Sequence, residues 1–533
     1  MSLMSYTSHF LHLPDDVLAY LLDFTPMNDL ESVSKTCNQL RVICGVVRAP
    51  YLHELKLEGL EYNAASASPT VSFPQALASL RCRENRWRTM RPIMSSCRAT
   101  LNDTDFTSYY QKVALYVSSQ VVSTVVHGDT SERATYHGQA GEVTRLHAAD
   151  VPQDLLVLLR THIGTNMSYL SFLSLREMSP HSAAASPTRV LITSMSLIGY
   201  FATPLDARGL RILGPWCAIL TTEPHSNVLL LCNWKTGALC KLAGIHSDKV
   251  DDFNFMNDRT LAVIHRASNP SHLILRLYDV IFPSQLCSFG LVTLRLSLQL
   301  PRIEAHVFIS PSRLMLPRAL QEQVLQPHQR PCEVFPPNSG IMALSTPLAT
   351  GGEKARLDIA IDVSMLLSII HGDNAADCAL PWSEWGPKVS RVFLINEALR
   401  ATGDVEPLQD VEGYRVAYST NVDVQDTCIG ISEEHSRPAA FVLDFSPASV
   451  RWARGEDKAR RGMRGALVTE ANVLRPGRLL AEEVVSSLPY TRTILAGYLP
   501  QHQIRLLRDE VVFPVGSFML IFLFEWLTRP FSF

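Results

Sequence analysis

Sequence signatures of catalysis are almost entirely lacking in this chain of 533 residues. It contains no GxSxG turn, no P-loop, no HExxH pair and no GxGxxG loop, the patterns typical of nucleophile, phosphate, zinc and dinucleotide sites. Its 11 cysteines include no CxxC pair, so the sequence predicts neither a zinc site nor a disulfide framework. We therefore expect no catalytic residue, no metal and no cofactor, and a reducing compartment, the cytoplasm or the nucleus.

Strong net charge and long apolar runs are lacking as well. The net charge is -3, so nothing in the overall balance points to nucleic acid or to an anionic membrane. The first residues, MSLMSYTSHFLHL, do not have the basic flank and continuous apolar core of a secretory signal. The apolar run from Val511 to Phe524 contains a proline and stops at Glu525, short of the roughly 20 residues of a spanning helix. We expect neither nucleic acid nor membrane as a partner.

The stretch LPDDVLAYLLDFTPMNDLESVSKTCNQL, from Leu13, has the punctuation of two helices. Pro14 suits a first helical position, and Asp15 and Asp16 then place negative charge at the positive end of the helix dipole. Pro26 ends this helix because proline cannot continue the hydrogen-bond ladder. Asn28 is the expected cap of a second helix, and a weaker third is expected around 51–57.

Both expected helices carry an apolar face. The first face is formed by Val17, Leu18, Leu21 and Leu22, and the second by Leu30, Val33, Cys37, Leu40 and Cys44. A unit of this size barely supports its own core, so part of the apolar surface should meet another body. That body is either the rest of this chain, in a packed helical hairpin, or a separate helical partner.

The same residues resemble the F-box motif, a helical module that binds the Skp adaptor of SCF-type ubiquitin ligases. One departure is Met27, where the family usually has leucine, a swap that conserves volume. The likeness is carried by Leu13-Pro14, Asp16-Val17-Leu18, Leu21, Phe24, Pro26, Asp29-Leu30, Val33-Ser34, Thr36-Cys37 and Leu40. It implies an adaptor-binding or motif-core surface made of Leu13, Pro14, Val17, Leu18, Leu21, Leu30, Val33, Cys37 and Leu40. The resemblance favours the docking interpretation, with a Skp adaptor and, through it, a cullin as partners.

The chain changes character after this unit. EYNAASASPTVS, from Glu61, is typical of a linker, and a helix is expected from about Ser72 through ALASLRCRENRWRTM. This helix carries several arginines, but Glu84 interrupts them and Trp87 belongs to an apolar stripe. We interpret it as a solvated helix that covers the next domain rather than a DNA-binding helix.

From about residue 105 the pattern is one of short apolar runs between turn residues, as expected of strands. The layout favours a β-propeller or an irregular relative, with a pair of β-sandwiches as the alternative. Trp216, Trp234, Trp382 and Trp385 are expected to pack inside it. The predicted strands are 154–159, 216–220, 227–237, 261–265, 273–280, 357–366, 389–395 and 439–445.

Looser motifs in this region resemble the propeller-like part of the expanded F-box proteins of basidiomycete fungi. They are NWKTG, FNFMNDRTLAV, LRLYDV, PWSEWGPKVSRVF, REMSPHSAAASP and LEGLEY. In such proteins the C-terminal domain is expected to recruit the protein substrate.

Two stretches depart from that likeness. SERATYHGQAGEVTRLHAAD, at 131–150, is polar and is expected to be a long loop or an insertion. The apolar tail from Pro514 is interpreted as an extension of the gene product, an extra strand or an aggregation-prone end. Asp251 and Asp252 are acidic neighbours, but their spacing alone gives no reason to select them.

The expected fold class is α+β and multidomain, with small all-α F-box helices followed by a mainly β, propeller-like domain. The expected domains are 1–60 (F-box helices), 61–104 (linker and basic helix), 105–513 (substrate-binding β domain) and 514–533 (apolar tail). The expected function is that of an F-box substrate-recognition subunit, not an enzyme. Its alternatives are a propeller scaffold outside any ligase and an enzyme with a site in the propeller channel. A receptor should leave Leu18 and Leu30 partly exposed, whereas a scaffold should bury them.

Overall fold

The structure is a computed structural model of the whole chain. Residues whose structure is described are 12–22, 25, 27–46, 52, 55, 60–62, 78, 80, 93–98, 106–110, 113–117, 121–126, 133–137, 142–150, 153–162, 167–191, 209–222, 227–241, 249–257, 259–267, 272–281, 291–316, 333–334, 339–351, 353–369, 379–396, 408–420, 439–454, 466–495, 505–507, 510–515 and 518–523. The helix expected from Ser72 lies outside this set, apart from Ala78 and Leu80, which are helical.

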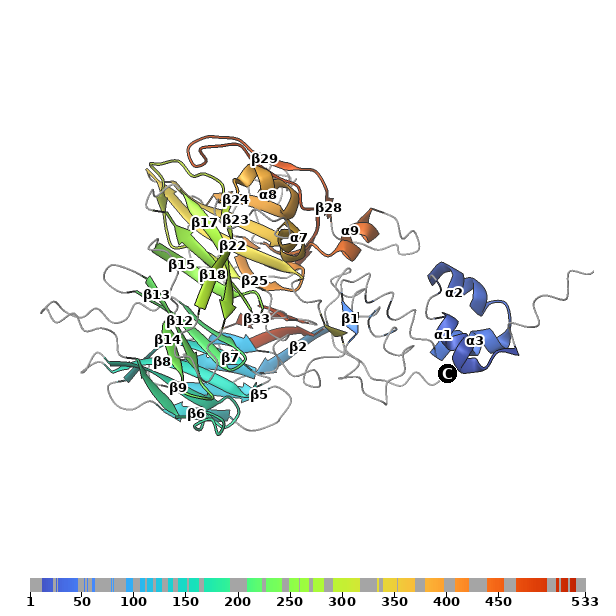
Figure 1. The fold of residues 1–533 in the computed structure, drawn as a ribbon, viewed down its shortest axis with the longest axis horizontal. Coiled ribbons are helices and arrows are strands. Elements are labelled where there is room, and N and C mark those ends of the chain that lie inside the picture. Colours follow the sequence, from blue (N-terminus) through green and yellow to red (C-terminus); the bar gives the residue numbers. More distant parts are fainter. Residues whose placement is uncertain are drawn as a thin grey trace, which may run out of the picture.

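Three short helices open the described chain: α1 (Asp15–Leu22), α2 (Met27–Ser34) and α3 (Asn38–Val46). They lie at one end of the long axis of the molecule (Figure 1). The first expected helix is present, but it begins at Asp15, one residue after Pro14, and ends at Leu22, before Pro26. The N–H of Leu18 bonds the carbonyl of Pro14 at 3.0 Å, and two acidic residues occupy the first turn of α1, as predicted. The helix ends where the Thr25 hydroxyl bonds the carbonyl of Leu21.

The second expected helix is in fact two helices, and the single-helix prediction was wrong. The Thr36 hydroxyl donates to the carbonyl of Val33 at 2.7 Å, and the N–H of Lys35 bonds the carbonyl of Ser32. These short-range bonds close a turn, and side-chain bonds of this kind compete with the helical ladder. Cys37 directly precedes α3, and its carbonyl accepts the N–H of Arg41.

The rest of the described chain is dominated by seven antiparallel sheets of four or five strands. Sheet 1 contains β3 (Phe106–Tyr110), β4 (Val113–Val117), β5 (Val121–Val126) and β6 (Arg133–His137), and sheet 2 contains β7 (Glu142–Asp150), β8 (Leu155–His162), β9 (Met167–Ser174) and β10 (Thr188–Leu191). Sheet 3 contains β11 (Gly209–Leu213), β12 (Trp216–Thr222), β13 (Asn227–Asn233) and β14 (Leu239–Lys241), and sheet 4 contains β15 (Lys249–Phe255), β16 (Thr260–Arg266), β17 (Leu273–Ile281) and β18 (Leu291–Gln299).

The later sheets include strands that are not consecutive: sheet 5 contains β19 (Phe308–Ile309), β20 (Arg313–Met315), β22 (Ile341–Thr350), β23 (Glu353–Asp362) and β24 (Ser390–Asn396); sheet 6 contains β25 (Leu408–Glu412), β26 (Arg415–Thr420), β27 (Ala439–Asp444), β28 (Ala466–Val468) and β31 (Tyr490–Leu495); and sheet 7 contains β2 (Ile93–Arg98), β32 (Arg505–Leu507), β33 (Glu510–Val515) and β34 (Phe518–Leu523).

The sheets follow one another as the blades of a propeller do. Sheets 1 to 4 each consist of four consecutive strands, so each is a local meander. Neighbouring sheets are in contact along the series β7, β11, β15 and β20, and again from β22 to β25 and from β25 to β32. Repetition of small sheets about a common axis is the propeller solution, whereas a sandwich stacks two large sheets. The fold is therefore α+β, with N-terminal helices and a mainly β, propeller-like domain.

Sheet 7 joins segments from the two ends of the β region. β2 pairs antiparallel with β34, from Ile93 opposite Leu523 to Arg98 opposite Phe518, and β34 continues through β33 to β32. Of the three interpretations of the tail from Pro514, the structure shows an extra strand. β2 also falls inside the stretch expected to be a linker and a helix. The division of the chain into four domains stays a prediction.

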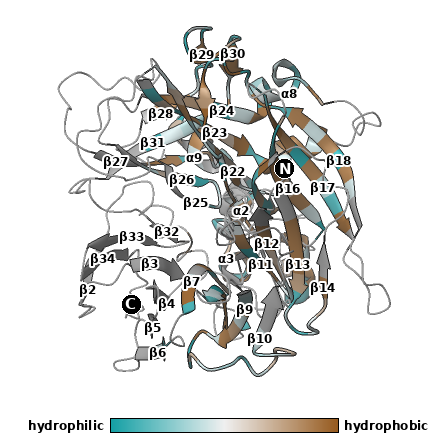
Figure 2. Ribbon diagram, turned by 90° about the vertical axis from the view of Figure 1, so that its left-hand side faces the viewer, coloured by the Kyte–Doolittle hydropathy of each residue, from teal (hydrophilic) through white to brown (hydrophobic). Residues whose placement is uncertain are grey.

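Buried apolar strands supply the core between sheets. β8 is buried along nearly its whole length, which matches the continuous apolar run predicted as a strand at 154–159. Strands with both faces covered are expected to read as continuous rather than alternating apolar runs. Figure 2 shows such hydrophobic stretches along β13, β17 and β18.

Two local predictions in the β region need correction. The stretch 131–150 is not a long loop, because it contains β6 and β7. The strand expected at 357–366 ends at Asp362, whose carboxylate accepts bonds from the Ser364 hydroxyl (2.6 Å) and the Met365 N–H (3.0 Å). This carboxylate caps the first turn of α7 (Val363–Ile369). Two further helices are α8 (Trp382–Val389) and α9 (Pro447–Ala453).

Candidate functional site

The three N-terminal helices have a core of their own. Leu18 and Leu22 of α1 are 0% and 3% exposed, and they meet Leu30 of α2 and Leu40 and Ile43 of α3. Every member of this cluster lies between residues 13 and 44. The helices therefore bury these leucines against one another, and not against the sheets.

One face of α1 points away from that core. Val17, Tyr20 and Leu21 are 39%, 62% and 42% exposed, at a spacing that places them side by side on the helix surface. Pro14, one turn earlier, is also exposed. Val42 of α3 is 68% exposed. We name Pro14, Val17, Tyr20 and Leu21 the α1 face.

The nine residues predicted for adaptor binding fall into three groups. Leu18, Leu30 and Leu40 are buried in the helical core; Leu13, Val33 and Cys37 are partly buried against it; Pro14, Val17 and Leu21 are exposed. The prediction that Leu18 and Leu30 are partly exposed was wrong. Their burial is what the scaffold alternative expects, but the side chains around them belong to the helices themselves and not to the β domain.

The sequence reasoning missed Tyr20 and Val42. Tyr20 lies three residues after Val17, which was among the residues predicted for adaptor binding, so helical spacing was an available signal.

A polar contact fixes α1 against α3, since the Gln39 amide donates to the Asp15 carboxylate at 3.0 Å. Burial raises the pKa of the Cys44 thiol, which therefore stays protonated and serves as packing.

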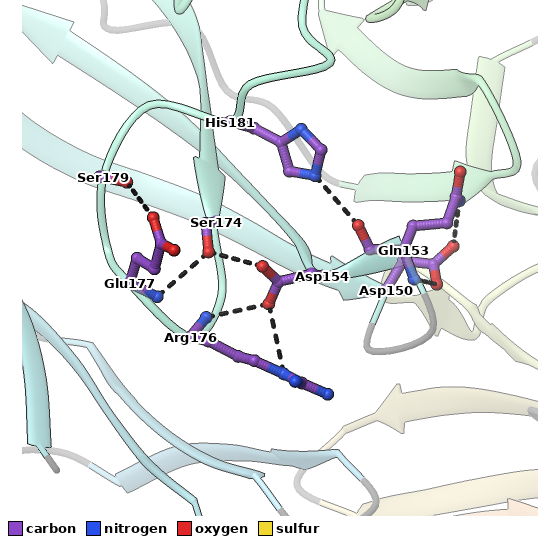
Figure 3. Close-up of polar contacts among 8 residues, drawn as sticks. All are labelled: Asp150, Gln153, Asp154, Ser174, Arg176, Glu177, Ser179 and His181. Atoms are coloured by element: carbon purple, nitrogen blue, oxygen red, sulfur yellow. Dashed lines mark hydrogen bonds and ion pairs between the residues drawn. The ribbon is translucent and has the colours of Figure 1, made fainter.

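A second ordered feature is the loop between β9 and β10, which contains REMSPHSAAASP (Figure 3). The Asp154 carboxylate accepts bonds from the Ser174 hydroxyl (2.6 Å) and the Arg176 N–H (3.0 Å). Ser174 in turn accepts the N–H of Glu177, whose carboxylate accepts the Ser179 hydroxyl at 3.0 Å. The cluster therefore fixes the path of the loop.

This loop packs on the NWKTG turn between β13 and β14. The rings of His181 and Trp234 meet edge to face, with centroids 4.9 Å apart. The indole N–H of Trp234 donates to the carbonyl of Gly214 at 2.9 Å, and the Gln153 amide donates to the same carbonyl at 3.0 Å. His181 also bonds the carbonyl of Gln153 (Figure 3). Two motifs that stand far apart in the sequence are thus one structural unit.

The four tryptophans expected to pack are all buried, which confirms that prediction. Trp382 and Trp385 lie on α8 with ring centroids 4.8 Å apart, and the indole N–H of Trp385 donates to the carbonyl of Gln299 in β18. Gly386 is required here, because a Cβ would overlap the Trp382 ring. This helix is a spacer between sheets 4 and 5.

Asp251 and Asp252, which their spacing in the sequence gave no reason to select, are central to the packing of sheets 3, 4 and 5. Asp251 pairs with Arg266 at 2.7 Å and accepts the N–H of Ser312 at 3.1 Å. Asp252 accepts the N–H of Leu314 at 2.8 Å and lies 3.5 Å from Arg211. Burial raises the pKa of Asp252, with Arg211 acting in the opposite direction.

The described part of the chain contains no group of three or more His, Cys, Asp or Glu side chains placed to hold a metal ion. Among the same residues, no helix combines the length and the apolar character needed to cross a membrane. The described structure consists of a helical module with an exposed apolar face, followed by a mainly β, propeller-like domain.

Comparison with known families agrees with that arrangement. The family model described as F-box domain matches residues 10–48, which include all three helices. The chain therefore carries an F-box domain, and proteins with this domain are in general non-catalytic adaptors of ubiquitin ligases. No curated protein matches the chain.

Solved structures similar to this one share little sequence with it. An uncharacterised protein of Listeria monocytogenes has 9% identity and a TM-score of 0.38, over 79% of this chain and 93% of that one. Drosophila semaphorin 2a has 9% identity and a TM-score of 0.35, over 81% of this chain and 75% of that one. The WD40 domain of Toxoplasma gondii coronin has 8% identity and a TM-score of 0.33, over 82% of this chain and 87% of that one. These TM-scores are too low to define the fold, which is defined by the order of the sheets.

Proposed function

We propose that this protein is an F-box substrate receptor of an SCF-type ubiquitin ligase, acting in the cytoplasm or the nucleus. Its α1 face binds a Skp adaptor and, through it, a cullin. Its β domain holds a target protein. The type within F-box proteins stays the one predicted from the motifs, the expanded basidiomycete form.

The observation that carries the proposal is the exposed apolar surface of a helical module whose core is already complete. Val17 and Leu21 are about two-fifths exposed although Leu18, between them, is fully buried. Apolar side chains that line one side of a short helix are the usual anchors for a partner helix or groove. A tyrosine among them, Tyr20, is a residue type enriched at interface hot spots.

The other predicted residues then have a supporting role. Leu18, Leu30 and Leu40 hold the three helices together and so fix the position of the α1 face. Leu13, Val33 and Cys37 line the border between core and surface. The receptor would need no bond chemistry of its own, because holding a target near the charged ubiquitin enzyme raises the effective concentration of its lysines.

The test is co-purification of the full chain with a Skp adaptor. The informative variant is Val17→Lys with Leu21→Lys, which places charge on the α1 face without touching the helical core. Met365→Lys on α7 is the matched control, because Met365 is 40% exposed and lies in the β domain. We expect the wild type and the control to capture the adaptor stoichiometrically. The double variant should bind it at least about tenfold more weakly, a loss of about 1.4 kcal/mol or more.

Thermal unfolding of each variant keeps the comparison interpretable. If the wild type captures no adaptor, or if the folded double variant captures it equally well, the receptor proposal fails. The first result would leave the alternative of a propeller scaffold outside any ligase.

A further inference from the structure

Arg391 of β24 is a buried cation most of whose donors lack an acceptor. It is 0% exposed, and its Nη1 donates to the carbonyl of Glu470 at 2.6 Å. The Nε and Nη2 atoms of the same guanidinium have no hydrogen-bond partner. Most buried polar atoms in proteins are bonded, so two orphaned donors on one charged group call for a physical explanation. Arginine does not lose its proton inside a protein, so it cannot relieve the cost by becoming neutral.

The surroundings of Arg391 are aromatic rather than acidic. Its Cζ lies 5.2 Å from the centroid of the Tyr490 ring, which itself packs on Phe393 and Phe445 at 5.9 Å and 5.3 Å. A tyrosine ring attracts a cation over its face, yet it carries no net negative charge that would balance a buried guanidinium. Burying a charge without a countercharge is strongly unfavourable.

Carboxylates of sheets 5 and 6 are engaged elsewhere. Asp444 on β27 lies 3.3 Å from Arg415 and accepts the Ser449 hydroxyl at 2.8 Å. Asp358 on β23 accepts the Ser345 hydroxyl at 2.6 Å. Among the residues that the structure describes, none offers a carboxylate to the guanidinium of Arg391. A bound anion would supply the missing countercharge.

Arg492 brings a second guanidinium toward the same ring. It lies on β31 two residues after Tyr490, so both side chains project from one face of the strand, roughly 7 Å apart along it. Arg492 is half-buried, and its Nη1 is a buried atom without a hydrogen-bond partner. Three orphaned donors, two on Arg391 and one on Arg492, thus gather at a tyrosine that belongs to the core between sheets 5 and 6. We name Arg391, Tyr490 and Arg492 the two-arginine site.

The cover over Arg391 is thin. Residues 469–471 connect β28 to β29 (Asn472–Leu474), and all three are exposed. The carbonyl of Glu470, in the middle of this connection, is the one that accepts the Arg391 N–H. Only this short connection therefore lies between that N–H and solvent, and loop motions on the nanosecond to microsecond scale admit a small ion.

We propose that the two-arginine site holds one small oxyanion of the phosphate or sulfate class between sheets 5 and 6. A guanidinium presents its N–H groups in a fixed fork that matches the oxygens of such an ion. Arg391 approaches the ion from sheet 5 and Arg492 from sheet 6, so the ion balances both charges and links the two sheets. Ligase function plays no part here, because the residues involved all belong to the β domain.

The first experiment asks whether the full-length protein carries the ion. The protein is equilibrated with inorganic phosphate, desalted and denatured in acid, and ion chromatography quantifies the phosphate released. Equilibrium dialysis with labelled phosphate detects an ion that exchanges too fast to survive desalting. We expect one phosphate per chain in one of these measurements, displaced by unlabelled sulfate. If neither measurement finds stoichiometric phosphate, the proposal is overturned, and ordered water is the partner of the orphaned donors.

Variants assign the ion to the site. Arg391→Lys keeps the charge but loses the fork, so it should take up phosphate about tenfold more weakly, and Arg391→Met should take up none. Arg415→Met on β26 is the matched control, because Arg415 is also buried but already has Asp444 as its countercharge. Its phosphate uptake should equal that of the wild type. If Arg391→Met does not fold, Arg391→Lys and Arg492→Met decide, and undiminished uptake by the folded variants overturns the proposal.

Thermal unfolding separates this binding from the general effect of salt. Phosphate is excluded from protein surfaces and so stabilises every variant to a similar degree. Specific binding adds a saturable rise in melting temperature, which we expect in the wild type and in Arg415→Met but not in Arg391→Met. A rise of the same size in all three proteins contradicts a site at Arg391.

Discussion

The carboxylate of Asp252 in sheet 4 accepts the backbone N–H of Leu314 in sheet 5 at 2.8 Å. The same carboxylate lies 3.5 Å from the guanidinium of Arg211, which belongs to sheet 3. One buried side chain therefore connects three successive sheets. A buried carboxylate is costly unless hydrogen bonds and a countercharge surround it, and here both are present.

Asp252 makes the stability of the β domain depend on pH. Burial raises its pKa in the folded protein above the ordinary value of 3.8, so the folded state binds a proton more readily than the unfolded state. The stabilising contribution is complete below that value and is lost as pH rises through the raised pKa. We expect Asp252→Asn, which cannot titrate, to gain stability relative to the wild type as pH rises above about 4. Denaturant unfolding from pH 4 to 7 measures this difference, and a difference independent of pH would contradict it.

The same substitution should be costly at Leu18 and nearly neutral at Leu21. Leu18→Ala removes a fully buried side chain and should destabilise the helices by about 2–5 kcal/mol, whereas Leu21→Ala should change stability by less than about 0.5 kcal/mol. Hydrogen–deuterium exchange of peptides from 15–46 in the full chain reports this local stability. Equal exchange in the two variants would mean that the assignment of core and surface on α1 is wrong.

Removal of β34 should weaken the whole β domain. A chain truncated after Val515 leaves β2 without its partner strand, since β2 pairs with β34. We expect a lower melting temperature and faster exchange in the peptide containing 93–98, because unpaired backbone groups lose their ladder. The control is a truncation after Glu525, which keeps β34. If both truncated proteins melt together, sheet 7 does not hold the ends of the domain.

Gly386 and Gly477 offer a matched pair for the packing of α8. A Cβ at Gly386 would overlap the ring of Trp382, whereas a Cβ at Gly477 meets nothing within 4 Å. Gly386→Ala should therefore cost about 1–3 kcal/mol, as overpacking does, and Gly477→Ala should be close to neutral. Thermal or denaturant unfolding of the two proteins decides, and an unchanged Gly386→Ala variant would show that Trp382 can move aside.

Local signals in the sequence were sufficient for several elements. Pro14 and the two aspartates after it predicted the start of α1, and the apolar run at 154–159 predicted β8. Both depend on interactions within a few residues. The break between α2 and α3 was missed, because the competing bond from Thr36 to Val33 has no distinctive sequence pattern.

The loop predicted at 131–150 was wrong because the partners of its polar residues lie on another strand. Tyr136 and Glu142 made 131–150 look like a loop, yet both contact the buried Arg160, at 2.6 Å and 2.7 Å. Their polarity is compensated by a residue on another strand, which a local pattern cannot reveal. Asp252 is a similar case, because its partners Leu314 and Arg211 lie on other sheets.

The sequence by itself determined the first of the N-terminal helices, the β character of the rest and the absence of common catalytic signatures, since these follow from spacing and residue type. The tertiary structure decided which apolar residues of α1 are core and which are surface, because neighbouring residues on a helix differ only in direction. It also decided that β2 joins β34 and that β1 (Glu61–Tyr62) joins β21 (Glu333–Val334). Those pairings depend on backbone hydrogen bonds between distant segments, and backbone groups are the same in every sequence.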